Sequence, residues 1–79
     1  MTRDEIFAKL TELFRDLFDD RSIVLTDATT ASDIEGWDSL EHVSLIVAVE
    51  KLFRVKFTMD EILSLRKVGD MADLVRKKT

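Results

Sequence analysis

Cysteine and proline are both absent from the 79-residue sequence, and glycine occurs only twice, at Gly36 and Gly69. Without cysteine the chain can form neither disulfides nor thiolate metal sites, and it suits a reducing compartment. Without proline, and with so little glycine, few positions would interrupt a helix. These absences favour an all-α chain.

Long apolar runs are also missing, since none approaches the roughly 20 residues that a membrane-spanning helix requires. The first ten residues, MTRDEIFAKL, are too polar for a signal peptide, so we expect a cytoplasmic protein. The formal net charge of −4 argues against nucleic acid as a partner, because an acidic surface repels phosphate backbones. The length predicts one monomeric domain over residues 1–79, too small for an active site built from several loops.

Capping boxes mark three helix starts, because a short polar side chain and an acid three residues later can satisfy free backbone N–H groups. The three pairs are Thr2 with Glu5, Asp38 with Glu41, and Thr58 with Glu61. They predict helices over residues 3–18, 39–54 and 58–65, and apolar spacing predicts a fourth over 68–77. We therefore predict a four-helix bundle with three long helices and a short third one.

Residues 19–37 form a long connection between the first two predicted helices, and this connection is rich in Ser, Thr and Asp. Connections of this length in a compact domain are usually functional or held in place by their own apolar residues. The residues expected to hold it are Ile23, Leu25, Ile34 and Trp37.

The predicted helix over 39–54 has apolar residues on two sides. At 100° per residue, the core-facing side carries Leu45, Ile46, Val49, Leu52 and Phe53. The opposite side is polar except for a strip formed by Leu40, Val43 and Val47. An apolar strip facing solvent indicates a docking surface, unless loop residues cover it.

Ser39 follows the cap residue Asp38 at the start of the same helix. A side chain at this position is accessible, and the free N–H groups and positive dipole end of the helix favour a nearby phosphate. Ser and Asp are also the commonest capping residues, so spacing alone leaves ordinary capping as an alternative.

The sequence contains few of the residues that an enzyme active site needs. His42, the only histidine, lies three residues after Ser39, but no carboxylate is placed to orient its ring and no glycine-rich turn supplies an oxyanion hole. We expect His42 to be a partly buried polar residue or to lie at a rim. The acids Asp33, Glu35 and Asp38 do not follow a calcium-loop pattern, so we predict no dedicated metal site.

The string GWDSLEHVSLIVAVEKLF, residues 36–53, closely resembles the attachment region of acyl carrier proteins. The hallmark of that family is Asp-Ser-Leu at the start of the second helix of a four-helix bundle. Here the motif is Asp38-Ser39-Leu40. The resemblance covers essentially the whole chain, because the family has the same order of helices and the same long loop.

The resemblance implies a carrier that catalyses nothing itself. A phosphopantetheinyl transferase would move 4′-phosphopantetheine from coenzyme A onto Ser39, and the thiol of this arm would hold an acyl group as a thioester. Asp38 would help the transferase to position its metal and the serine. Acyl-loading, condensing or acyl-transferring enzymes would contact Leu40, Glu41, Val43, Val47 and Glu50, the two glutamates through basic patches on those enzymes.

The apolar interior is a candidate shelter for the acyl chain, with simple core packing as the alternative for each residue. The candidates are Ile34, Val43, Ile46, Phe57, Ile62 and Leu63. The predicted helix over 39–54 carries no net charge, whereas general fatty-acid carriers are strongly acidic there. The chain therefore looks more like a carrier of a specialised pathway for secondary metabolites, modified lipids or cell-envelope sugars.

Two alternatives remain open. An aminoacyl carrier, peptidyl or D-alanyl, would share the arm and the fold and differ in its cargo. An unmodified helical adaptor would bind its partner through the strip on the second helix and would have no use for an arm.

Overall fold

The computed structural model describes residues 1–79 and contains helices but no strands. The elements are α1 (Arg3–Leu17), the 3₁₀ helix η1 (Ala31–Asp33), α2 (Ser39–Phe53), α3 (Met59–Ser64) and α4 (Val68–Lys78). The predicted all-α fold with a short third helix is confirmed, and each predicted helix end lies within one residue of the observed one. No helix has both the length and the apolar character that crossing a bilayer requires.

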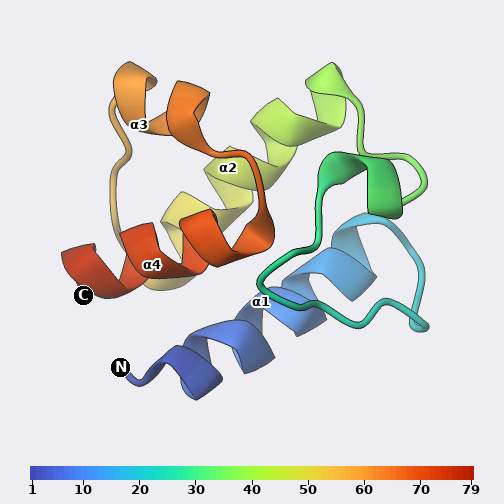
Figure 1. The fold of residues 1–79 in the computed structure, drawn as a ribbon, viewed down its shortest axis with the longest axis horizontal. Coiled ribbons are helices and arrows are strands. Elements are labelled where there is room, and N and C mark those ends of the chain that lie inside the picture. Colours follow the sequence, from blue (N-terminus) through green and yellow to red (C-terminus); the bar gives the residue numbers. More distant parts are fainter.

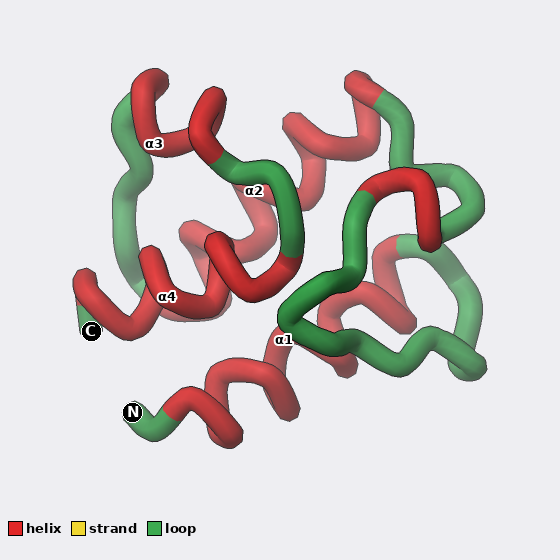
Figure 2. The backbone as a smooth tube through the Cα atoms, viewed as in Figure 1, coloured by secondary structure: helices red, strands yellow, loops and turns green.

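The connection from α1 to α2 crosses the molecule and passes beside the start of α4 (Figure 1). It is loop and turns except for η1, a helix that the sequence pattern did not predict (Figure 2). Within it, the Asp33 carboxylate accepts a hydrogen bond from the Thr30 N–H at 2.9 Å. This bond stabilises the single turn of η1.

Reciprocal capping boxes begin α1 and α3, as predicted. The Thr2 hydroxyl accepts the Glu5 N–H at 3.2 Å, and the Glu5 carboxylate accepts the Thr2 N–H at 2.9 Å. Thr58 and Glu61 repeat this exchange at 3.1 and 2.8 Å. Each box satisfies two N–H groups that would otherwise have no partner at the helix end.

Only half of a capping box begins α2. The Asp38 Oδ1 accepts the Glu41 N–H at 2.8 Å. The reciprocal bond, in which the Glu41 carboxylate would accept the Asp38 N–H, is not formed. The helix ends at Arg54, whose φ of 57° is in the left-handed region that terminates many helices.

One core of 16 buried apolar residues joins the helices and their connections. The helices contribute Ile6, Leu10, Phe14, Leu45, Ile46, Val49, Phe53, Val68, Met71, Ala72 and Val75. The connections contribute Ile23, Leu25, Ile34, Val55 and Phe57, and Trp37 packs against them half-buried. The prediction that Ile23, Leu25, Ile34 and Trp37 hold the long connection is therefore confirmed.

Leu52 does not face the core as predicted, since it is 40% exposed. It lies in the last turn of α2, at a groove that it shares with Ala8 and Leu13 of α1. All the residues that line this groove come from α1 and α2, so no third element covers Leu52 there.

The start of α4 depends on the long connection. The N-cap residue Lys67 supplies no side-chain hydrogen bond. Backbone carbonyls of the long connection accept the first N–H groups in its place. Val68 donates to the Thr29 carbonyl at 2.8 Å, and Gly69 donates to the Asp27 carbonyl at 3.1 Å. This approach requires glycine, because a Cβ at Gly69 would lie 2.8 Å from the Asp27 carbonyl oxygen.

Arg3 of α1 contacts both of these segments, the long connection and α4. Its guanidinium pairs with Asp27, donates to Asp73 at 3.0 Å and reaches the Gly69 carbonyl at 3.3 Å. It also lies over the Phe7 ring, 5.1 Å from the ring centroid. The hydrogen bond from Arg3 lowers the pKa of Asp27, so this carboxylate stays charged at neutral pH.

We expect Gly69→Ala to lower the free energy of unfolding by about 1–3 kcal/mol, because the methyl group would be forced against the Asp27 backbone. Urea unfolding followed by circular dichroism measures this loss. The control is Ser44→Ala, at an exposed position of α2, which should stay within about 0.5 kcal/mol of the wild type. Equal stability of Gly69→Ala and the wild type would contradict the close approach.

Candidate functional site

The last residues of the long connection bring Ser39 to the start of α2. Gly36 has a φ of +90°, which L side chains rarely adopt, and its carbonyl accepts the Asp38 N–H at 3.1 Å. Between them, Trp37 packs edge-on against Phe14 of α1, with ring centroids 5.3 Å apart. A glycine turn and an aromatic contact therefore fix the position of the helix start.

Ser39 is the first residue of α2, and its side chain is exposed. The Asp38 carboxylate caps the helix by accepting the Glu41 N–H. Because Asp38 is the cap, the Ser39 hydroxyl is not required for capping. The structure thus disfavours the ordinary capping alternative for this serine.

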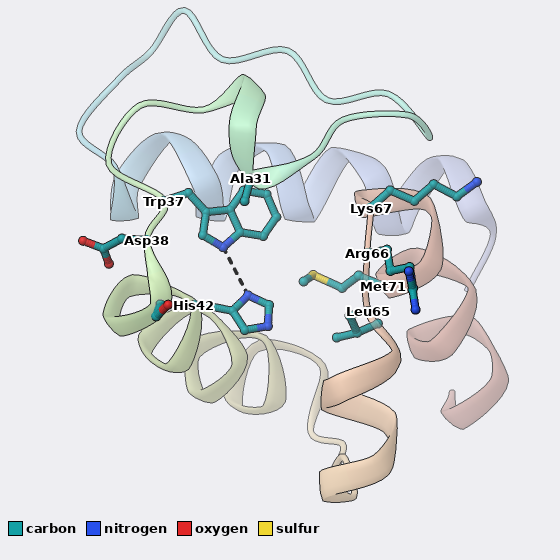
Figure 3. Close-up of a pocket in the computed structure, with 9 residues that line it drawn as sticks. Ala31, Trp37, Asp38, His42, Leu65, Arg66, Lys67 and Met71 are labelled. Carbon is teal, nitrogen blue, oxygen red and sulfur yellow. Dashed lines mark hydrogen bonds between the residues drawn. The ribbon is translucent and has the colours of Figure 1, made fainter.

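A pocket of about 440 Å³ opens beside Ser39. Its walls come from η1, the start of α2, the α3–α4 connection and α4, and Figure 3 shows Trp37 and His42 across from Leu65 and Met71. The lining residues are Ala31, Trp37, Asp38, Ser39, His42, Leu65, Arg66, Lys67 and Met71. The pocket therefore combines an apolar interior with charged groups.

His42 is held by Trp37 at this pocket. The indole Nε1 donates to the imidazole Nδ1 at 3.1 Å, and the two ring planes are inclined by only 18° (Figure 3). Because Nδ1 accepts, the proton of the neutral ring lies on Nε2. Burial lowers the pKa of His42 from its ordinary value of 6.5, which keeps the ring neutral at pH 7. The prediction that His42 is a partly buried polar residue is confirmed.

The apolar strip of α2 is uncovered. Leu40 is 74% exposed, Val43 is 61% exposed and Val47 is 44% exposed. Loop residues therefore do not cover it, and the alternative raised by the sequence does not hold.

Glu50 differs from the other residues predicted to meet partners. Its side chain is half-buried, and its Oε2 accepts the Phe57 N–H at 2.8 Å. The carboxylate therefore holds the chain that follows α2, an internal role that the sequence did not reveal. Glu41 is half-buried and Asp38 is exposed, both at the opposite end of the helix.

None of the candidate acyl-pocket residues lines the pocket beside Ser39. Ile34, Ile46 and Phe57 are buried in the core, and Ile62 packs against it. Leu63 is 73% exposed, so the prediction that it lines the interior is wrong, as it is for the exposed Val43. The short α3 turns only Ile62 toward the core, and its neighbour Leu63 is rotated away by about 100°.

The comparisons with known proteins agree with this geometry. Residues 8–75 match the family described as "Phosphopantetheine attachment site". Acyl carrier proteins from Petrotoga mobilis and Thermosynechococcus vestitus are each 34% identical over 79 residues, which is 99% of this chain and 92% and 96% of theirs. The solution NMR structure of holo acyl carrier protein from Geobacter metallireducens has a TM-score of 0.86 and 53% identity, covering 91% of this chain and 83% of that one.

Fold, site and relatives together define a carrier that binds phosphopantetheine covalently and is not an enzyme. The chain belongs to the acyl carrier protein family. Its partners therefore include a phosphopantetheinyl transferase and acyl-handling enzymes. The residues present fit the arm, because an exposed hydroxyl stands at a helix N-terminus beside an open pocket. When bound, the arm supplies a thiol that holds acyl groups.

The lowered pKa of His42 predicts a specific pH dependence of stability. In the unfolded chain His42 is protonated as the pH falls below about 6.5, whereas in the folded chain it is protonated only at lower pH. The contribution of His42 is therefore fully present above about pH 6.5 and is lost as pH falls through the folded pKa. Urea unfolding of the wild type should show this loss, and His42→Gln should lack it. An identical pH dependence in the two proteins would contradict the burial of His42.

Proposed function

We propose that Ser39 carries the 4′-phosphopantetheine arm. The observation that supports this most is the exposed Ser39 hydroxyl, at the first position of α2 and not needed as its cap. The arm would present acyl intermediates as thioesters to enzymes of a fatty-acid-like, specialised lipid or secondary-metabolite pathway. We further propose that the chain acts as a monomeric domain, residues 1–79, in the cytoplasm.

The helix start favours attachment electrostatically. The free N–H groups of the first turn and the positive end of the helix dipole stabilise negative charge on a phosphate bonded to Ser39. Asp38 caps the helix through Oδ1, so Oδ2 is available to coordinate the metal of the transferase. Asp38 thus serves both the fold and the attachment step.

The partner enzymes would dock on the apolar strip of α2. Leu40, Val43 and Val47 supply exposed apolar contact next to the arm, and Asp38 and Glu41 supply negative charge at the same end. Burial of such a strip against a partner removes apolar surface from water, at about 25 cal/mol per Å². Glu50 is left out of this surface, because Phe57 holds its carboxylate.

A longer acyl chain would enter the core from the pocket beside Ser39. Met71 supports this path, since it lines that pocket and also belongs to the buried core. The acyl chain would then separate Ile34, Ile46, Phe57 and Ile62. The uncharged balance of α2 supports a specialised pathway, because partners that recognise a densely acidic helix would bind it less well.

Attachment is tested by intact mass after incubation with coenzyme A and a broad-specificity phosphopantetheinyl transferase. The wild type should gain one phosphopantetheine, and Ser39→Ala should gain none. Ser44→Ala is the matched control, an exposed serine of the same helix, and it should be modified like the wild type. Modification of Ser39→Ala would place the arm elsewhere, and no modification of any form would favour the adaptor.

Docking on the strip is tested by Val47→Arg. We expect wild-type circular dichroism, because Val47 is exposed, and a kcat/KM with a carrier-dependent acyltransferase at least about 10-fold lower, because charge enters an apolar contact. Leu45→Ala is the contrast, since Leu45 is fully buried and its loss should cost about 2–4 kcal/mol of stability. An unfolded Val47→Arg, or an unchanged kcat/KM, would contradict the docking surface.

A further inference from the structure

We propose that the C-terminal end of α2 is a second docking site, which binds a carboxylate-bearing patch on the partner enzyme. This inference rests on the proposed function, because it concerns the enzymes that act on the loaded carrier. It names a partner chemistry that the apolar strip alone does not specify.

A hollow of about 410 Å³ lies at this end of the helix. Three cations, Lys51, Arg54 and Lys56, line it together with Val47, Glu50 and Val55. All three cations are exposed, and each lies outside the ion pairs that the protein forms. We call these three residues the basic end.

Glu50 offsets only part of the charge of the basic end, because one carboxylate lines the hollow beside three cations. Its carboxylate accepts the Phe57 N–H at 2.8 Å, and its carbonyl accepts the Val55 N–H at 3.1 Å. The half-buried side chain is thus turned toward the chain that follows α2. An acidic side chain of a partner that enters the hollow would meet three cations and one half-buried carboxylate that already accepts the Phe57 N–H.

Helix stability explains only part of this arrangement. Cations in the last turn complement the helix dipole, which accounts for Lys51 and Arg54. Lys56 lies beyond the end of the helix and gains little from the dipole, whose effect falls off within one turn. Its presence beside the other two is better explained by binding to an anionic group.

The basic end continues the apolar strip, since Val47 belongs to both. Asp38 and Glu41 flank the other end of the strip, so the surface runs from acidic through apolar to basic along α2. A nucleic acid or an anionic bilayer offers one sign of charge only, whereas a protein surface can match both. The partner is therefore a protein with basic residues near the arm and acidic residues about 15–20 Å farther along the helix.

Charge reversal tests this inference. In the holo protein, Lys51, Arg54 and Lys56 are replaced together by Glu, and the control replaces Lys9, Arg76 and Lys77, exposed cations of α1 and α4, by Glu. Both variants carry the same net charge. Each is assayed with a fatty-acid-type acyltransferase whose carrier-binding surface is basic, and with a variant of that enzyme whose basic residues facing this end of α2 are replaced by Glu.

With the native acyltransferase, kcat/KM should rise about 10-fold for the basic-end variant and stay within about 2-fold for the control. The glutamate-bearing enzyme should instead prefer the wild-type carrier, and both preferences should shrink at about 0.5 M NaCl. If the triple variant fails to fold by circular dichroism, Lys51→Glu against Lys9→Glu gives the same comparison with smaller changes.

Equal behaviour of the basic-end and control variants with both enzymes would overturn the docking site. The docking site would also be overturned if the basic end were needed for binding to anionic phospholipid vesicles while the preference for one carrier variant did not reverse between the two enzymes. Intact mass is recorded first. If the wild type cannot be loaded with phosphopantetheine, both the proposed function and this inference are wrong. If the wild type is loaded but the preference does not reverse between the two enzymes, only the docking site is wrong.

Discussion

The anchoring of the long connection near its middle and at its end positions Ser39. Near its middle, the carbonyls of Asp27 and Thr29 accept the first N–H groups of α4, and Arg3 ties that junction to α1. Near its end, Trp37 packs on Phe14. Since a loop of this length has many alternative conformations, these contacts are what make the start of α2 a fixed point in the molecule.

The sequence reveals features that local chemistry determines. The capping boxes at Thr2 and Thr58 locate two helix starts, and the exposed strip on α2 follows from helical phase. Contacts between distant segments were not predictable in this way. The pocket beside Ser39 combines residues from Ala31 to Met71, and no local pattern links them. Leu52 and Leu63 were misplaced because phase gives a direction on the helix, while exposure depends on whether another element covers that direction.

The same limit applies to Glu50. Its acceptor role depends on the left-handed Arg54, which reverses the chain and brings the Phe57 N–H within 2.8 Å of the carboxylate. An acid that looks available for partners in the sequence is therefore used within the protein. The consequence is a helix whose exposed charges differ in sign from one end to the other, although its formal charges balance. Such a pattern favours partners by charge arrangement as well as by apolar contact.

We propose that the start of α2 and the pocket beside it form the environment of the arm. Amide and indole proton–nitrogen NMR spectra of the unmodified and phosphopantetheine-loaded protein test it most directly. We expect the shift changes to concentrate at Ser39, the Trp37 indole, His42 and the α3–α4 connection, with little change at the C-terminal end of α2. Changes centred on the first half of α1, or around another serine, would contradict it.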